Sequence, residues 1–197
     1  PAGSGNYVGA KSGDAASQRY SRLHTYLRGA ATTTPAAQAD GSYNGAALPG
    51  SITYAGDAPI RMLTFAEYNF IRAEAALYGV PGDAQTFFDA GIRASMQMAG
   101  VSAAAADAYL LANGVLTGSN EQKLNRIIQE KYVASYGVIM EHWTDWRRTG
   151  YPQITQVSNA VIAGIPRSLL YPQSEVDLNP NAPKQKASLL EKIFLDN

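Results

Sequence analysis

Cysteine is absent from this chain of 197 residues. Without a thiol the chain forms no disulfide, offers no thiolate to a metal and carries no cysteine nucleophile. Histidine is almost absent too, since His24 and His142 are the only two. Two histidines leave little material for a zinc site. We therefore expect no metal, no cofactor and no catalytic residue of these kinds.

Charge is scarce and evenly balanced. Sixteen Lys and Arg residues oppose sixteen Asp and Glu residues, and charged residues make up 16% of the chain, against about 25% in an ordinary domain. A nucleic-acid binder needs a basic face that replaces condensed counterions, so we expect no nucleic-acid partner. No stretch approaches the roughly 18 continuous apolar residues of a membrane-spanning helix.

The length suits one domain or a large part of one. The first residue is Pro1 rather than Met, and no signal-peptide pattern follows it. We expect the sequence to have been cut from a longer chain, in which any export signal or lipid anchor lies upstream.

Composition divides the chain into three stretches. Residues 1–60 are rich in Gly, Ala, Ser and Thr and read as a loop-rich segment that faces a ligand, with one helix expected at 14–28. Residues 61–150 carry helical periodicity. Residues 151–197 contain five prolines and read as irregular, with a short terminal helix at 188–195. The fold class we predict is mainly α, with long irregular loops.

Two helices of the middle stretch begin at clear capping residues. Thr64 with Glu67 forms a capping box, and Asp83 caps a second helix after a four-residue connection. Such a short connection predicts an antiparallel helical hairpin, similar to half of a tetratricopeptide repeat. The residues that we expect in the core recur at helical spacing: Tyr68, Ile71, Phe88, Ile92, Leu124, Ile128 and Trp146.

Further helices are expected downstream. Ser102 begins a short Ala-rich helix that ends near Asn113, and Ser119 opens another capping box. The longest periodic stretch then runs over 120–147, about 42 Å if straight. Gly137 is expected to bend this single helix.

The stretch 141–148 (EHWTDWRR) concentrates polar and aromatic side chains. His142 and Asp145 share a helix face and could form a base dyad or half of a metal site. The alternative is that Trp and His pack under the helix while Asp145 forms ion pairs with arginines. We favour the structural interpretation, because no nucleophile motif accompanies the cluster. Glu67 and Glu74, on one face of an earlier helix, are likewise read as structural rather than catalytic.

Tyrosine is abundant, with twelve residues, and several lie outside the expected helices. A tyrosine presents a rigid apolar ring and a hydroxyl, which suits the stacking and hydrogen bonding of a sugar. We predict Tyr43 and Tyr54 as ligand-binding residues, because small neighbours on both sides allow a sugar to approach closely. The stretch 51–55 around Tyr54 is expected to pair as a short strand.

Several motifs in order resemble one known family. They are 64–75 (TFAEYNFIRAEA), 88–96 (FDAGIRASM), 127–132 (IIQEKY), 143–152 (WTDWRRTGYP), 165–167 (IPR) and 171–175 (YPQSE). Together they are similar to the C-terminal portion of SusD/RagB-like outer-membrane nutrient-binding lipoproteins.

The resemblance implies a fold of tetratricopeptide-like helical hairpins in one SusD-like domain, of which this chain is an incomplete part. It implies a surface lipoprotein of the outer membrane, anchored through a lipid on a missing N-terminal part. The expected function is to bind an oligosaccharide and deliver it to a SusC-like TonB-dependent transporter, without catalysis.

Three alternatives remain open. The ligand could be a peptide rather than a glycan, or the chain could be a tetratricopeptide-like interaction scaffold with no small ligand. A hydrolase is the third, and it would need Glu141, His142 and Asp145 to converge in an open pocket.

Overall fold

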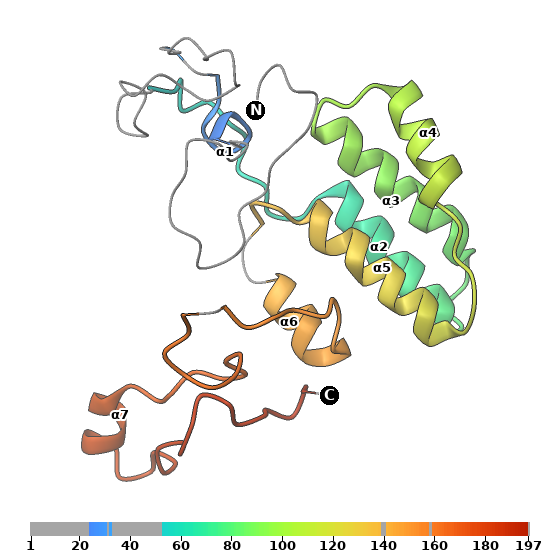
Figure 1. The fold of residues 1–197 in the computed structure, drawn as a ribbon. Coiled ribbons are helices and arrows are strands. Elements are labelled where there is room, and N and C mark those ends of the chain that lie inside the picture. The colour runs from blue at the N-terminus through green and yellow to red at the C-terminus, as the bar shows by residue number, and fades with distance from the viewer. Residues whose placement is uncertain (1–23, 31, 33–52, 139–140, 158, 197) are drawn as a thin grey trace. The chain divides into compact units, whose positions relative to one another are not determined.

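A computed structural model describes the chain except for residues 1–23, 31, 33–52, 139–140, 158 and 197 (Figure 1). The described residues divide into two compact units. The loop-rich unit comprises Pro1–Met62 and Val157–Asn159, and the helical unit comprises Leu63–Gln156 and Ala160–Asn197. The helices are α1 (His24–Arg28), α2 (Phe65–Leu77), α3 (Ala84–Met98), α4 (Ala103–Asn113), α5 (Asn120–Ala134), α6 (Glu141–Thr149) and α7 (Gln173–Leu178).

Helices α2 and α3 form the expected hairpin. The Thr64 hydroxyl accepts a hydrogen bond from the Glu67 backbone N–H, and the Asp83 carboxylate accepts one from Thr86 N–H. Between the helices Gly79 has a φ of +92°, a left-handed conformation that glycine adopts without a Cβ penalty. Local capping and turn chemistry therefore place the two helices antiparallel, as predicted.

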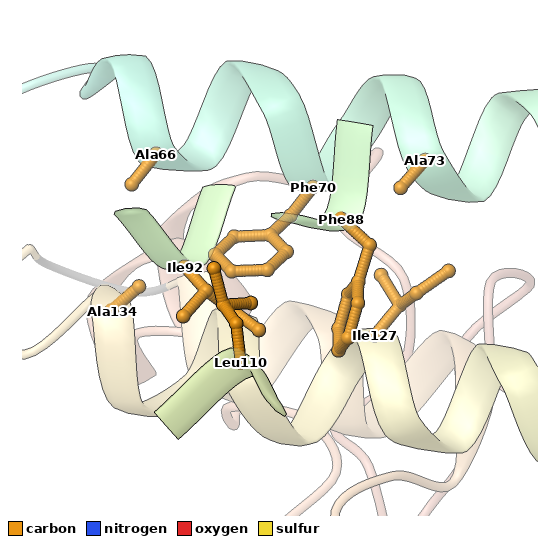
Figure 2. Packing of buried hydrophobic residues seen from close by; sticks show 8 residues of the cluster. All are labelled: Ala66, Phe70, Ala73, Phe88, Ile92, Leu110, Ile127 and Ala134. Carbon is orange, nitrogen blue, oxygen red and sulfur yellow. The ribbon is translucent and has the colours of Figure 1, made fainter. Parts of the chain in front are cut away.

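The apolar core lies between α2, α3, α4 and α5 (Figure 2). Its buried members are Ala66, Phe70, Ala73, Phe88, Ile92, Leu110, Ile127 and Ala134. Phe70 and Phe88 meet edge to face, with ring centroids 6.1 Å apart. Four helices that share one core form the framework of the helical unit.

Five of the predicted core residues are buried, but the predicted face of α2 is wrong. Tyr68 is 43% exposed and Ile71 is 44% exposed, whereas Phe70 and the small Ala66 and Ala73 are buried in the core. The reason lies in α3: a Cβ added at Gly91 would come within 2.9 Å of the Phe70 ring. Close helix approach selects the face with small residues, although the opposite face of α2 carries more large apolar side chains.

The α4 and α5 boundaries agree with the predicted ones at their N-termini. Ser102 caps α4, and Ser119 with Gln122 forms a complete capping box at the start of α5. The Gln85 side chain of α3 ties down the connection between them by donating to Gly114 O at 2.6 Å and accepting from Leu116 N–H at 2.8 Å.

The single bent helix predicted over 120–147 is wrong, because the chain forms two helices instead. α5 ends at Ala134, Ser135 is its C-cap, and α6 begins at Glu141. Gly137 has a φ of +83°, which ends a helix rather than bends it. Because the helix is interrupted here, α6 does not continue along the axis of α5.

The short terminal helix predicted at 188–195 is also wrong. Those residues form turns, in which the Glu191 carboxylate accepts from Ala187 N–H and the Asp196 carboxylate accepts from Ile193 N–H. Such local side-chain bonds compete with helix formation. A helix forms earlier instead, as α7, after Pro172.

The loop-rich unit is described for α1 and for residues 53–62. Backbone hydrogen bonds of 2.9 Å join Thr32 N–H to Thr53 O, Ala55 N–H to Ala30 O and Gly56 N–H to Arg28 O. The pairing expected around Tyr54 is present as this short ladder. The helix expected at 14–28 is described only from His24 onward.

No helix in the described part of the chain has both the length and the apolar character needed to cross a bilayer.

Candidate functional site

A pocket in the loop-rich unit surrounds one of the two predicted ligand-binding tyrosines. Its volume is about 510 Å³, and the described residues that line it are Leu27, Arg28, Thr53, Tyr54 and Gly56. The short backbone ladder described above joins both walls, so α1 and the segment around Tyr54 are held at a fixed separation. Tyr43, the other predicted residue, lies outside the described residues.

The pocket combines an aromatic ring with a cation. The Arg28 guanidinium carbon lies 5.3 Å from the centroid of the Tyr54 ring, within the range of a cation–π contact. Ala55 and Gly56 beside the ring are exposed, and a Cβ added at Gly56 would meet no heavy atom within 4 Å. The small neighbours of Tyr54 therefore leave open space, which was the reason for predicting it.

A second aromatic–arginine contact supports this unit. Arg61 lies over the Tyr26 ring at 3.7 Å and donates a hydrogen bond of 3.1 Å to Tyr26 O. This contact holds the chain after Tyr54 against the start of α1.

A second hollow, polar in character, lies at the start of α5. Its volume is about 300 Å³, and it is lined by Val115, Thr117, Gly118, Gln122, Asn125, Arg126 and Gln129. Sequence reasoning missed it. Its signal was the run of uncharged polar residues at i, i+3 and i+7 on one face of the α5 helix, at Gln122, Asn125 and Gln129.

The stretch 141–148 forms a buried ion-pair cluster between α2, α5 and α6. Lys131 Nζ lies 2.9 Å from an Asp145 carboxylate oxygen and 3.9 Å from a Glu67 oxygen. Arg148 donates to both Glu74 oxygens, at 2.5 and 2.7 Å, and to Asp145. The hydrogen bonds to Glu74 raise the pKa of the Arg148 guanidinium, so Arg148 stays charged and fastens α6 to α2.

Glu67 occupies the least favourable position in this cluster. Burial raises the pKa of its carboxyl above the ordinary value, the positive charge of Lys131 acts in the opposite direction, and Glu141 raises it further. One Glu67 oxygen is buried with no hydrogen-bond partner among the described residues. Both observations favour a carboxyl that retains its proton more readily than an exposed one.

His142 and Asp145, the candidate dyad on α6, contact different groups rather than each other. His142 Nε2 lies 2.9 Å from Tyr132 O, and because a carbonyl only accepts, this nitrogen carries the proton. The ring also meets Tyr132 edge to face at 4.7 Å. Asp145 is committed to Lys131 and Arg148. This geometry matches the structural interpretation rather than a catalytic dyad.

The tryptophans of α6 hold the irregular C-terminal segment. Trp143 Nε1 donates to Pro166 O at 2.7 Å, and Arg147 lies 3.9 Å over the Trp143 ring. Arg167 covers Trp146 at 4.6 Å. Among the residues that the structure describes, no three His, Asp or Glu side chains gather where they could hold a metal ion.

Known proteins share this architecture. A SusD-like family model described as "Starch-binding associating with outer membrane" matches residues 2–172. A SusD homolog from Bacteroides fragilis is 32% identical, with a TM-score of 0.52, over 58% of this chain and 29% of its own. The protein described as "Bacteroidetes AC2a SusD-like" is 30% identical, with a TM-score of 0.55, over 60% of this chain and 26% of its own.

A structure described as a chitin-binding protein is 28% identical, with a TM-score of 0.52, over 59% of this chain and 27% of its own. The chain therefore spans less than a third of the length of these relatives. No curated protein matches it. The predicted mainly α fold of tetratricopeptide-like hairpins and the predicted family are confirmed. With a family match over residues 2–172 and helices arranged as in SusD homologs, this chain belongs to the SusD-like family.

Proposed function

We propose that the protein binds a nutrient oligosaccharide at the cell surface and passes it to a SusC-like TonB-dependent transporter. The family description and the chitin-binding relative support a glycan as the ligand. The family description also supports the outer membrane as the location, with a lipid anchor as the expected attachment. Transfer to such a transporter is proposed from the resemblance of the sequence motifs to the family.

The observation that carries the proposal is the pocket around Tyr54. A tyrosine ring, an arginine and open backbone meet there within about 510 Å³, a volume within the usual range of small-ligand sites. A few hydrogen bonds, each with a net contribution of about 1 kcal/mol, would give weak binding that permits release to a transporter. Tyr43 remains a proposed second contact.

Calorimetry against a panel of oligosaccharides and tetrapeptides tests the proposal. We expect a glycan to bind the wild type, and the Tyr54→Ala variant and the Tyr43→Ala, Tyr54→Ala double variant to bind it at least about tenfold more weakly. Tyr78→Ala is the matched control, since Tyr78 is 65% exposed in the helical unit and should leave affinity unchanged. Binding of peptides alone would contradict the glycan assignment.

We propose no catalysis. His142 and Asp145 are engaged by backbone and by cations, as described above, and no nucleophile motif is present in the sequence. The panel glycans should therefore stay intact during long incubation with the protein. Release of new reducing ends that disappears in a folded His142→Ala variant would contradict this.

One observation favours the alternative of an interaction scaffold. Phe65 and Tyr68 stack on the exposed side of α2 with centroids 5.9 Å apart, and Arg72 lies next to them over Phe87 at 4.6 Å. Aromatic and arginine side chains are enriched at protein interfaces. Failure to bind any glycan, together with self-association in ultracentrifugation that Phe65→Ser abolishes, would support the scaffold.

A further inference from the structure

The pocket around Tyr54 contains an arginine, Arg28, that forms no ion pair with any described residue. Among the residues that the structure describes, no carboxylate oxygen lies within 4 Å of the Arg28 guanidinium nitrogens, and the guanidinium carbon lies 5.3 Å from the centroid of the Tyr54 ring. The Asp57 carboxylate lies against Gly29, and Asp57 is not among the described residues that line the pocket. Arg28 is therefore a cation that faces an open pocket.

The other described arginines are used differently. Arg93, Arg126 and Arg148 each pair with a carboxylate at 2.5–2.6 Å. Arg147 and Arg167 lie within 4 Å of Asp196. Arg61 and Arg72 donate to backbone carbonyls. Each of these seven arginines thus has a carboxylate or carbonyl partner, although Nε of Arg61, Nε of Arg147 and Nη1 of Arg167 make no hydrogen bond to a described residue. The Arg28 guanidinium has neither kind of partner among the described residues, so its donors are available to a ligand.

We infer that this pocket selects a sugar residue that carries an anion, a uronic carboxylate or a sulfate ester, bound by Arg28 while the sugar ring contacts Tyr54. The inference rests on the proposed function, because it names the class of glycan for the same site. A planar guanidinium presents two parallel N–H donors that match the two oxygens of such an anion. The ring and the cation lie close enough for one monosaccharide to reach both.

A backbone hydrogen bond fixes the position of Arg28. The backbone O of Arg28 accepts from Gly56 N–H at 2.9 Å, so the residue is tied to the chain two residues after Tyr54. The Thr32 and Thr53 hydroxyls meet at 2.6 Å at the other end of the same ladder. The arginine and the tyrosine are thereby held on one small framework.

The hollow on α5 provides an internal contrast. It also contains an arginine, but Arg126 lies 2.6 Å from Glu130 and donates to Asn113 O. A guanidinium whose charge is already paired offers little to an anion. Because the whole chain has a net charge of zero, attraction of an anionic sugar must come from a local unpaired cation.

The test is calorimetry with matched probes. Oligogalacturonate is compared with its fully methyl-esterified form, and a sulfated galactan oligosaccharide with its desulfated form. We expect one of the two anionic probes to bind at least about tenfold more tightly than its neutral partner, as charge-assisted hydrogen bonds require. Which of them binds distinguishes carboxylate from sulfate. Raising the salt to about 0.5 M should remove most of the difference.

Variants locate the effect. Arg28→Gln should weaken binding of the anionic probe at least about tenfold and so abolish the preference for the anion. Arg126→Gln is the control and should keep the preference. Asp57→Asn should strengthen binding of the anionic probe slightly, because it removes a nearby negative charge. Circular-dichroism melting verifies that each variant is folded.

Two results separate the inference from the proposed function. Equal affinity for the charged and neutral members of both pairs would overturn the anion selectivity and leave glycan binding in place. Absence of binding to every probe in these pairs and in the wider glycan panel would overturn the proposed function, and the inference with it.

Discussion

The two units of the protein are stabilised in different ways. The helical unit buries Phe70, Phe88 and Ile127 completely and adds a buried ion-pair cluster. In the described part of the loop-rich unit no side chain is buried, and a few backbone hydrogen bonds and arginine–tyrosine contacts maintain the pocket. The core that stabilises the fold therefore lies in the helical unit, whereas the binding site that we propose lies in the loop-rich unit. If both hold, a substitution should affect stability or binding, but not both.

The largest effect is expected from emptying the core. Phe88→Ala should lower the free energy of unfolding by about 3–5 kcal/mol, because a fully buried aromatic ring is removed. Phe65→Ala on the exposed side of α2 is the control and should cost about 0.5 kcal/mol or less. Urea denaturation measures both. A loss below about 1 kcal/mol for Phe88→Ala would contradict the packing of α3.

The next effect concerns the ion-pair cluster. Lys131→Met should cost about 3 kcal/mol, because it leaves the buried carboxylates of Glu67 and Asp145 with less compensating charge. The loss should be smaller at pH 5 than at pH 7, since a carboxyl without its cation takes up a proton more easily. A loss that does not vary with pH would mean that Lys131 acts through packing alone.

A smaller effect is expected where α6 holds the C-terminal segment. Trp143→Phe keeps an aromatic side chain at this position but removes the indole N–H that donates to Pro166 O. The expected cost is about 1 kcal/mol, the net value of one hydrogen bond. Hydrogen exchange should accelerate around residues 160–170 while α2 and α3 keep their protection. Acceleration throughout the helical unit would contradict a local role.

The pH dependence of stability should carry a contribution from Glu67. Its pKa is raised in the folded state, so the folded protein binds a proton more tightly than the unfolded chain does. As pH rises above the ordinary value of 4.5, this group therefore lowers stability until it has ionised in the folded protein. The Glu67→Gln variant should lose less stability than the wild type over that range in pH-dependent urea melts. Parallel curves for the two proteins would contradict a raised pKa.

The smallest effect on stability is expected in the pocket itself. Tyr54→Ala should change the free energy of unfolding by about 0.5 kcal/mol or less, because the ring is not buried. The same variant should lose glycan affinity, which calorimetry measures. A cost of several kcal/mol would mean that Tyr54 serves the fold, and the separation of the two units would fail.

The sequence was sufficient to predict what local patterns determine. Phe88, Ile92, Leu124 and Ile128 recur at helical spacing on helices with one apolar face, and their burial followed. Helix α2 is apolar on both sides, so periodicity could not choose between them. Which face of α2 is buried depends on Gly91 in α3, a tertiary contact that the sequence of α2 alone does not show.

Other features depend on partners distant in sequence. Lys131 meets both Glu67 and Asp145, and Arg148 meets Glu74 across 74 positions, which no spacing rule indicates. Apolar residues recur at helical spacing on both α5 and α6, so the pattern over 120–147 continues across the break at Gly137 and does not reveal it. In the pocket, Tyr54 was chosen for its ring and small neighbours, whereas Arg28 was missed, since only the backbone ladder brings it to Tyr54.

The most direct test of the account is hydrogen exchange measured by mass spectrometry with and without the tightest-binding glycan of the panel. If the glycan binds in the loop-rich unit, it should protect peptides that carry residues 27–28 and 53–56, the stretches that contribute to the pocket. Peptides from α3 in the helical core should be unchanged. Protection confined to the helical unit, for example around the hollow on α5, would contradict the assignment of binding to the loop-rich unit.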